Sequence, residues 1–219
     1  MGRINQLLLL IVTAFAVGVN ARNGLDFIQA VSVATMKCLK NDGINFIIPR
    51  VYTNLGYIDE TGISNIKNAH AGGIPYVDGY IFPCVGSSRC ASAATQVSTA
   101  LNRIKAEGTY IGTLWLDIER LSWPADHATN RKFIEAMVAE ANALKHAVGI
   151  YSNYYNWEAI VGLDYTGQSH LPLWWAEYDG TPGFAKYKEF GGWKQPNVHQ
   201  WHGTEAGPCG VSVDLNYSP

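Results

Sequence analysis

Two acidic residues separated by one position, Asp117 and Glu119, follow an apolar run in the middle of the chain. If this run is a β-strand, Trp115, Asp117 and Glu119 project from one face, and the apolar side chains between them project from the other. Two carboxylates about 6.6 Å apart along a strand do not both ionise readily in a confined site, so one keeps its proton to higher pH. Such a pair suits glycosidic bond cleavage, which needs a proton donor and a negative group beside the developing positive charge.

The same spacing also fits a structural pair at a strand end, with Arg120 as the neighbouring cation. Two more aspartates, Asp26 and Asp214, lie at the ends of other short apolar runs. Taken singly, each of them suits a turn or a helix cap. Because all three acidic motifs end inferred strands, we expect them to meet at one site.

Short runs rich in β-branched and aromatic residues alternate with longer amphipathic stretches, which predicts strands and helices in alternation. Glycine residues such as Gly108 mark the returns from helix to strand. We expect strands at 24–27, 45–52, 75–82, 110–118, 147–151, 172–176, 198–201 and 213–215, and helices near 32–41, 59–71, 91–107 and 128–145.

This alternation predicts an α/β fold in which right-handed crossovers join parallel strands. About eight strands can close into a single-domain, TIM-like (β/α) barrel. Residues 172–216 hold three expected strands linked by loops rich in Gly and Pro, so we expect a regular first half and an irregular, helix-poor second half. In such barrels the site lies at the carboxyl ends of the strands, where the acidic motifs fall.

The first 21 residues have the layout of a secretory signal peptide. Arg3 is followed by an apolar run at 7–17, and Val19-Asn20-Ala21 offers a cleavage site, with Ala16 as a second one. A membrane anchor is disfavoured because the run is shorter than the roughly 20 residues that span a bilayer. We therefore expect a secreted protein whose single barrel domain covers residues 22–219.

The charge balance of the expected mature chain is slightly negative. The sequence has 16 Lys and Arg and 18 Asp and Glu, and removing Arg3 leaves 15 against 18, or −3. No basic patch of the kind that binds nucleic acid or a membrane surface is present, so we expect neither partner. With a pI near 6.3, the protein is repelled weakly by anionic polymers at neutral pH and attracted in acid.

Four cysteines, an even number in an expected secreted chain, predict two disulfides. Cys84 and Cys90 bracket a short loop and favour a local bridge, which leaves Cys38 to pair with Cys209. Three pairings are formally open. A zinc site is disfavoured because no Cys-x-x-C motif and no neighbouring His cluster is present, so we expect no metal and no cofactor.

Several motifs in a fixed order make the chain resemble glycoside hydrolase family 25, the Chalaropsis-type lysozymes. They are Gly24-Leu25-Asp26, Leu116-Asp117-Ile118-Glu119, Pro172-Leu173-Trp174-Trp175-Ala176-Glu177-Tyr178, His199-Gln200-Trp201 and Val213-Asp214-Leu215-Asn216. The cysteines and the run at 80–84 are similar to those of the small secreted lysozymes of nematodes and amoebae. The resemblance covers essentially the whole expected mature chain.

The resemblance implies a lysozyme that hydrolyses the β-1,4 bond between N-acetylmuramic acid and N-acetylglucosamine in bacterial peptidoglycan. Glu119 matches the general acid/base, Asp117 its partner carboxylate, and Asp26 and Asp214 the other two acidic positions. Anomeric configuration is expected to be retained, either through the substrate's own 2-acetamido group, which Asp117 or Asp214 orients, or through an aspartate that acts as the nucleophile. We favour the first route. Four aromatic residues near strand ends are expected to contact sugar or to pack in the core: Tyr80, Tyr151, Trp175 and Tyr178.

Further expectations concern the setting of this activity. We expect a monomer that acts on peptidoglycan, outside the cell or in the lumen of an acidic compartment, in defence or digestion. One alternative is a non-catalytic glycan-binding protein on the same barrel. Another is a chitinase-like glycosidase, but its Asp-x-x-Asp-x-Asp-x-Glu motif would need acidic residues where Gly112 and Trp115 stand. Glu177 departs from the glutamine of many family members.

Overall fold

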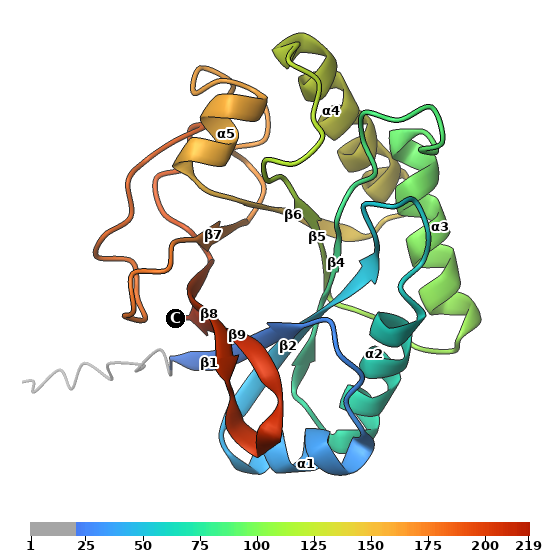
Figure 1. The fold of residues 1–219 in the computed structure, drawn as a ribbon, viewed down its shortest axis with the longest axis vertical. Helices are drawn as coiled ribbons and strands as arrows, with labels where there is room; N and C mark the ends of the chain where they lie inside the picture. The colour runs from blue at the N-terminus through green and yellow to red at the C-terminus, as the bar shows by residue number, and fades with distance from the viewer. Residues whose placement is uncertain (1–20) are drawn as a thin grey trace, which may run out of the picture.

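The computed structural model describes residues 21–219, except for the side chains of residues 204 and 205. The expected signal peptide lies outside the described residues, apart from Ala21. Among the described residues, no helix has the length and apolar character needed to cross a membrane. Figure 1 shows a closed ring of strands with helices along one side and a long loop along the other.

Eight strands form the barrel, and a two-residue strand, β3 (Tyr76–Val77), pairs with β2 beside it. The ring closes because β1 pairs with both β2 and β9. The barrel strands are β1 (Arg22–Phe27), β2 (Ile44–Tyr52), β4 (Gly79–Ile81), β5 (Thr113–Asp117), β6 (Ala147–Ser152), β7 (Leu173–Ala176), β8 (Val198–Ala206) and β9 (Ser212–Ser218). The predicted TIM-like barrel is therefore confirmed.

The last strand departs from the expected all-parallel arrangement. β9 is antiparallel to both β8 and β1, whereas the other neighbouring pairs are parallel. The connection from β8 is only a short turn with the 3₁₀ helix Pro208–Gly210, which is too short for the crossover that a parallel strand requires. The expectation of parallel strands throughout was wrong at this point.

The helices lie mainly in the first two thirds of the chain, as expected. They are α1 (Val33–Asn41), α2 (Glu60–Gly72), α3 (Ala93–Ala106), α4 (His127–Ala143) and the short α5 (Tyr154–Ile160), which the sequence pattern did not predict. A Ser, Asp or Asn side chain accepts a backbone hydrogen bond at the N-terminus of each, at positions 32, 59, 92, 126 and 153. No α-helix separates β7 from β8, so the second half is irregular.

Apolar side chains pack in two layers, one between the barrel and its helices and one inside the barrel. The inner layer is built around Trp115 and Trp174, whose rings meet edge to face with centroids 5.9 Å apart. Gly149 makes room for this layer, since a Cβ there would lie 2.4 Å from the Trp115 ring. The inner layer consists of Phe46, Ile48, Trp115, Tyr151, Trp174, Ala176 and Val198.

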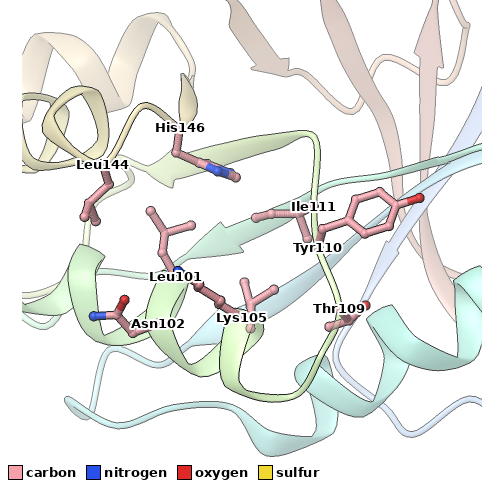
Figure 2. A pocket seen from close by; sticks show the side chains of 9 residues that line it. Leu101, Asn102, Lys105, Thr109, Tyr110, Ile111, Leu144 and His146 are labelled. Atoms are coloured by element: carbon pink, nitrogen blue, oxygen red, sulfur yellow. The ribbon is translucent and has the colours of Figure 1, made fainter.

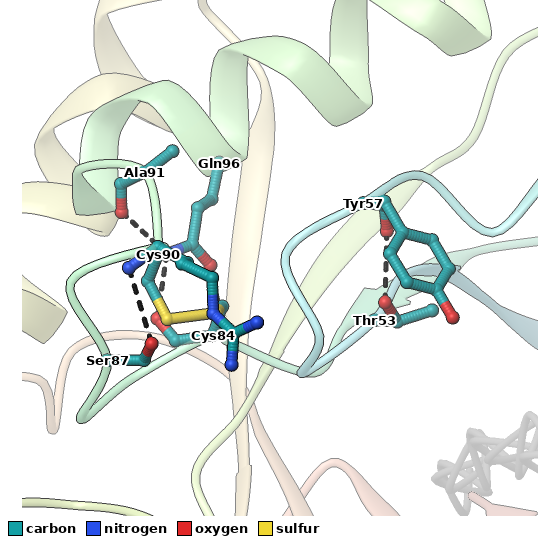
Figure 3. Close-up of a disulfide and its surroundings, with 8 residues drawn as sticks. Thr53, Tyr57, Cys84, Ser87, Cys90, Ala91 and Gln96 are labelled. Atoms are coloured by element: carbon teal, nitrogen blue, oxygen red, sulfur yellow. Dashed lines mark hydrogen bonds between the residues drawn. A yellow bond between two sulfur atoms is a disulfide. The ribbon is translucent and has the colours of Figure 1, made fainter.

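Two disulfides fasten loops to this framework, in the pairing that the sequence favoured. Cys38 in α1 is bonded to Cys209 in the β8–β9 connection, and Cys84 is bonded to Cys90 in the loop after β4. Figure 3 shows the second bridge beside Gln96 of α3. The Gln96 amide accepts from the Cys84 N–H at 2.9 Å and donates to the Cys84 carbonyl at 2.8 Å, which ties the loop to the helix.

Candidate active site

The three expected acidic motifs meet at one end of the barrel. Asp26 and Asp117 lie near the carboxyl ends of β1 and β5. Asp214 lies near the start of β9, and because β9 runs in the opposite direction, its start reaches the same end. Asp26 and Asp214 face each other as register partners in the β1–β9 ladder. The sequence therefore placed Asp214 at the mouth, although it assumed a parallel strand.

A buried glutamine, Gln200 of β8, joins these aspartates to two tyrosines. Its amide nitrogen donates to Asp26 Oδ1 at 2.8 Å and to Asp214 Oδ2 at 3.1 Å. Its amide oxygen accepts from the hydroxyl groups of Tyr151 at 2.7 Å and Tyr178 at 3.1 Å. All four hydrogen-bonding positions of the amide are thus used, which fixes its orientation.

A second amide, Asn216 of β9, holds Asp26 from the other side. Its nitrogen donates to Asp26 Oδ1 at 2.6 Å, and its oxygen accepts from the indole N–H of Trp174 at 2.7 Å. Trp174 belongs to the inner apolar layer, so the polar network rests directly on the packed floor of the barrel. This support holds the Asp26 carboxyl group in place.

Asp26 is buried and lies beside a second acidic group. Burial and, after it, the Asp214 charge raise the pKa of Asp26 to about 8, although the hydrogen bonds from the amides of Asn216 and Gln200 lower it. The folded barrel therefore favours a proton on Asp26 near neutral pH.

Asp117 is also buried, and its Oδ1 atom has no hydrogen-bond partner within the described part of the chain. Burial raises the pKa of Asp117 well above its usual range, and the charges of Glu119 and Asp26 add to the effect. Arg50 opposes it. The unpartnered oxygen leaves Asp117 with a free hydrogen-bonding position at the site, which is costly unless a ligand uses it.

Glu119 lies just beyond β5 and lines a pocket of about 320 Å³. Burial raises the pKa of its carboxyl group, and the nearby Asp214 charge raises it further. A carboxyl group with a raised pKa in a solvent-reachable pocket is suited to general acid catalysis. The pocket is lined by Glu119, Tyr151, Asn153, Tyr155, Asn156, Ala176, Glu177 and Tyr178.

The backbone that carries Glu119 is held on both sides. The Ile118 N–H donates to the Tyr151 carbonyl at 2.8 Å, and the Ser152 hydroxyl donates to the Ile118 carbonyl at 2.7 Å. Arg120 turns away and donates through its side chain to Asn156 Oδ1 at 3.2 Å. Among the ion pairs of the described residues, none joins Arg120 to Asp117 or Glu119, so the purely structural ion pair considered from the sequence is not observed.

Three of the four expected aromatic residues lie at this site. Tyr151 and Tyr178 bond to Gln200, and the Asp26 and Asp117 charges raise the pKa of Tyr80, after burial as the main cause. Trp175 does not join them. It is 3% exposed, lies in the outer apolar layer and stacks on His199 with ring centroids 4.1 Å apart. Trp175 thus matches the alternative of core packing, because successive strand residues face opposite sides and Trp174 takes the inward place.

The sequence motifs contained Gln200 and Asn216 without revealing their roles. Strand alternation was the available signal: Gln200 lies two residues after the inward Val198, and Asn216 two residues after Asp214. Arg50, whose side chain also reaches this region, forms an ion pair with Asp59 at 2.8 Å. In the described part of the chain, no group of three His, Cys, Asp or Glu side chains is arranged to hold a metal ion.

Other pockets lie away from the carboxylates. Figure 2 shows one of about 270 Å³ between α3 and the start of β6, with Leu101 and Lys105 on one side and Leu144 and His146 on the other. Another pocket, of about 730 Å³, lies at the opposite end of the barrel and is lined by residues at the starts of strands, such as Arg22 and Thr113. Neither is lined by Asp26, Asp117, Glu119 or Asp214, the four residues of the acidic cluster.

Comparison with known proteins agrees with this geometry. The family model described as "Lysozyme-like protein 1" matches residues 18–201. The chain is 62% identical over 199 residues to "Lysozyme-like protein 5" of Caenorhabditis elegans, covering 91% of this chain and 92% of that protein. It is 38% identical over 201 residues to "Probable GH family 25 lysozyme 2" of Dictyostelium discoideum, covering 92% of each.

Among solved structures, a family GH25 lysozyme from Aspergillus fumigatus shares the fold, with a TM-score of 0.71 at 20% identity over 91% of this chain and 94% of that one. The fold, the family model and the two relatives point to the same group of proteins. The chain belongs to the glycoside hydrolase family 25 lysozymes.

Proposed function

We propose that this protein is an N-acetylmuramidase that hydrolyses the β-1,4 bond between N-acetylmuramic acid and N-acetylglucosamine in bacterial peptidoglycan. The observation that carries the proposal is the pairing of Glu119, a carboxyl group with a raised pKa in an open pocket, with Asp117, a buried carboxyl group with an unpartnered oxygen. The names of the relatives support the same activity, since they are described as lysozymes or lysozyme-like proteins.

In the proposed reaction, Glu119 donates its proton to the glycosidic oxygen as the C1–O bond of the muramic acid residue breaks. The carbonyl oxygen of that residue's own 2-acetamido group forms a bond to C1 and gives an oxazolinium ion. Glu119, now a carboxylate, takes a proton from a water molecule. The water oxygen attacks C1, which breaks the bond between C1 and the acetamido oxygen and opens the oxazoline ring. Two displacements at C1 retain the anomeric configuration.

Asp117 is the better candidate to orient the acetamido group. Its Oδ1 is free to accept the acetamido N–H, whereas Asp214 Oδ2 already accepts from Gln200. The positive charge that develops on the acetamido nitrogen stabilises ionised Asp117 and so offsets the burial that raises the pKa of that group. Asp214 then acts through its charge, which raises the pKa of Glu119, and Asp26 and Asp214 together hold Gln200 and its tyrosines.

Exposed tyrosines around the mouth support a polysaccharide substrate. Tyr57 in the loop after β2, Tyr155 in α5 and Tyr178 after β7 are each more than half exposed. Flat aromatic faces with a polar edge are suited to stacking on sugar rings and to hydrogen bonding with their hydroxyl groups. Tyr155 and Tyr178 line the Glu119 pocket itself.

For the setting, we propose a monomer secreted through residues 1–21 that works in an acidic lumen, in defence or digestion. The support is the expected net charge of −3, which becomes more positive in acid and then favours contact with anionic bacterial walls. The rate of lysis of whole bacterial walls should peak below pH 7. A peak at or above pH 7.5 would contradict the acidic setting.

The experiment that tests the activity is digestion of purified peptidoglycan followed by identification of the new reducing ends. The proposal expects reduced muramic acid after borohydride treatment. Reduced glucosamine would instead indicate a glucosaminidase. No new reducing ends of either kind would favour a glycan-binding protein without catalysis.

A further inference from the structure

A second pocket of about 220 Å³ opens next to the Glu119 pocket. The two pockets share Tyr155 and Glu177, so a group bound in one can extend into the other. The second pocket lies between α5 and the long β7–β8 loop, which are side by side in Figure 1. Its lining residues are Tyr154, Tyr155, Trp175, Glu177, Asp179, Lys186 and Lys188.

The two lysines of this second pocket, Lys186 and Lys188, differ in their partners. Lys186 lies 3.6 Å from Asp179 Oδ2 and donates to the Asp179 carbonyl at 3.3 Å. Lys188 has no acidic partner among the ion pairs of the described chain; its Nζ lies 3.5 Å from the centre of the Tyr154 ring. A cation–π contact of this kind positions the ammonium group without neutralising its charge.

Tyr154 itself is firmly placed. Its ring packs edge to face on Phe190, a buried residue of the β7–β8 loop, with centroids 6.5 Å apart. Helix α5 and the loop are further joined by Trp157 and Trp193, whose ring centroids are 4.9 Å apart. The free positive charge of Lys188 is therefore presented from a packed surface beside the active-site pocket.

The chemistry of the proposed substrate explains what such a charge could bind. If the C1–O bond of muramic acid breaks beside Glu119, that sugar ring lies in the Glu119 pocket. Its lactyl group carries a short peptide with free carboxylates, and this stem must leave the ring close to the same residue. The adjoining pocket offers a fixed ammonium group for a carboxylate, and Glu177 can accept from peptide N–H groups.

We propose that Lys188 binds a carboxylate of the peptide stem, so that the enzyme prefers glycan strands that carry stems over bare strands. This inference rests on the proposed muramidase function. It assigns substrate selection to the β7–β8 loop, which lies outside the acidic cluster.

The test measures kcat/KM on two soluble substrates, uncross-linked glycan strands with their stems and the same strands after an amidase has removed the stems. The ratio of the two values is compared for the wild type, Lys188→Gln, Lys188→Arg and Lys132→Gln. Lys132 lies exposed on α4, so its replacement removes the same charge at a distance from the site.

The wild type should prefer stem-bearing strands by about three- to tenfold, the range of one partly exposed charge-assisted contact. Lys188→Gln should bring the ratio close to one, while Lys188→Arg and Lys132→Gln should keep it near the wild-type value. A wild-type ratio of one, or a ratio that Lys188→Gln does not change, would overturn the inference alone. Absence of cleavage of both substrates by the wild type would overturn the proposed function.

Discussion

Replacing Gln200 with leucine removes the four hydrogen bonds that join two tyrosines to two aspartates, while keeping a side chain of similar volume. The buried hydroxyl of Tyr151 then lacks its acceptor, which costs about 1–3 kcal/mol. Loss of the amide donor to ionised Asp26 costs a further ~1.5–3 kcal/mol, because hydrogen bonds to charged groups are the stronger ones. Asp26 keeps the Asn216 donor at 2.6 Å, so we expect a total of roughly 3–5 kcal/mol when Asp26 is ionised.

The loss in the free energy of unfolding caused by Gln200→Leu should depend on pH. Burial raises the pKa of folded Asp26 to about 8, against about 3.9 in an unfolded chain. Asp26 therefore contributes stability that is fully present below the unfolded pKa and is lost as pH rises through about 8. At pH 4.5 Asp26 is protonated in the folded state, so Gln200→Leu should cost only about 1–3 kcal/mol, chiefly from Tyr151.

The measurement is urea unfolding followed by tryptophan fluorescence at pH 4.5 and pH 9, with the disulfides intact. Gln195→Leu is the matched control, because Gln195 is exposed at the opposite end of the barrel and its replacement should change the free energy of unfolding by less than about 0.5 kcal/mol. Equal losses for Gln200→Leu at the two pH values would refute the assigned coupling to Asp26. A loss no larger than that of the control would refute the hydrogen-bond network.

Two further predictions concern charge and covalent links. The Asp214 charge raises the pKa of Glu119, so Asp214→Asn should move the basic limb of the pH profile of kcat/KM to lower pH; an unchanged limb would count against Glu119 as the proton donor. The Cys38–Cys209 bridge spans 171 positions and the Cys84–Cys90 bridge spans 6. Because a longer closed loop restricts the unfolded chain more, Cys38→Ser should lower the free energy of unfolding by about 5 kcal/mol and Cys90→Ser by about 2 kcal/mol, measured in urea. Equal losses in the two variants would contradict that entropic reasoning.

Much of the barrel could be predicted because its signals are local. The apolar runs of β2, β5 and β6 and the helical spacing of α3 reflect burial on one or both faces, which composition and periodicity record directly. α5 was missed because it is only seven residues long, too short to display a clear period. The predicted direction of β9 was wrong because the direction depends on the length of the β8–β9 turn, whose sequence does not differ from that of other loops.

The acidic positions of the site could be predicted from motif order, but the groups that support them could not. Gln200 acquires its role only when β1, β6, β8 and β9 come together, since its four partners come from distant parts of the chain. Trp174 and Trp175 are adjacent and chemically alike, and only the register of β7 decides which one faces inward. Long-range contacts of this kind leave no periodic mark in the sequence.

The most direct test of the central claim is turnover and binding by Glu119→Gln, measured beside Glu158→Gln. Glu158 is exposed on α5, so its replacement makes the same chemical change outside the acidic cluster. Removal of a general acid lowers rates by about 10²–10⁴-fold, so Glu119→Gln should lose at least a hundredfold in kcat on peptidoglycan. The variant should still bind the polymer, and Glu158→Gln should remain as active as the wild type. Turnover by Glu119→Gln within tenfold of the wild type would contradict the account.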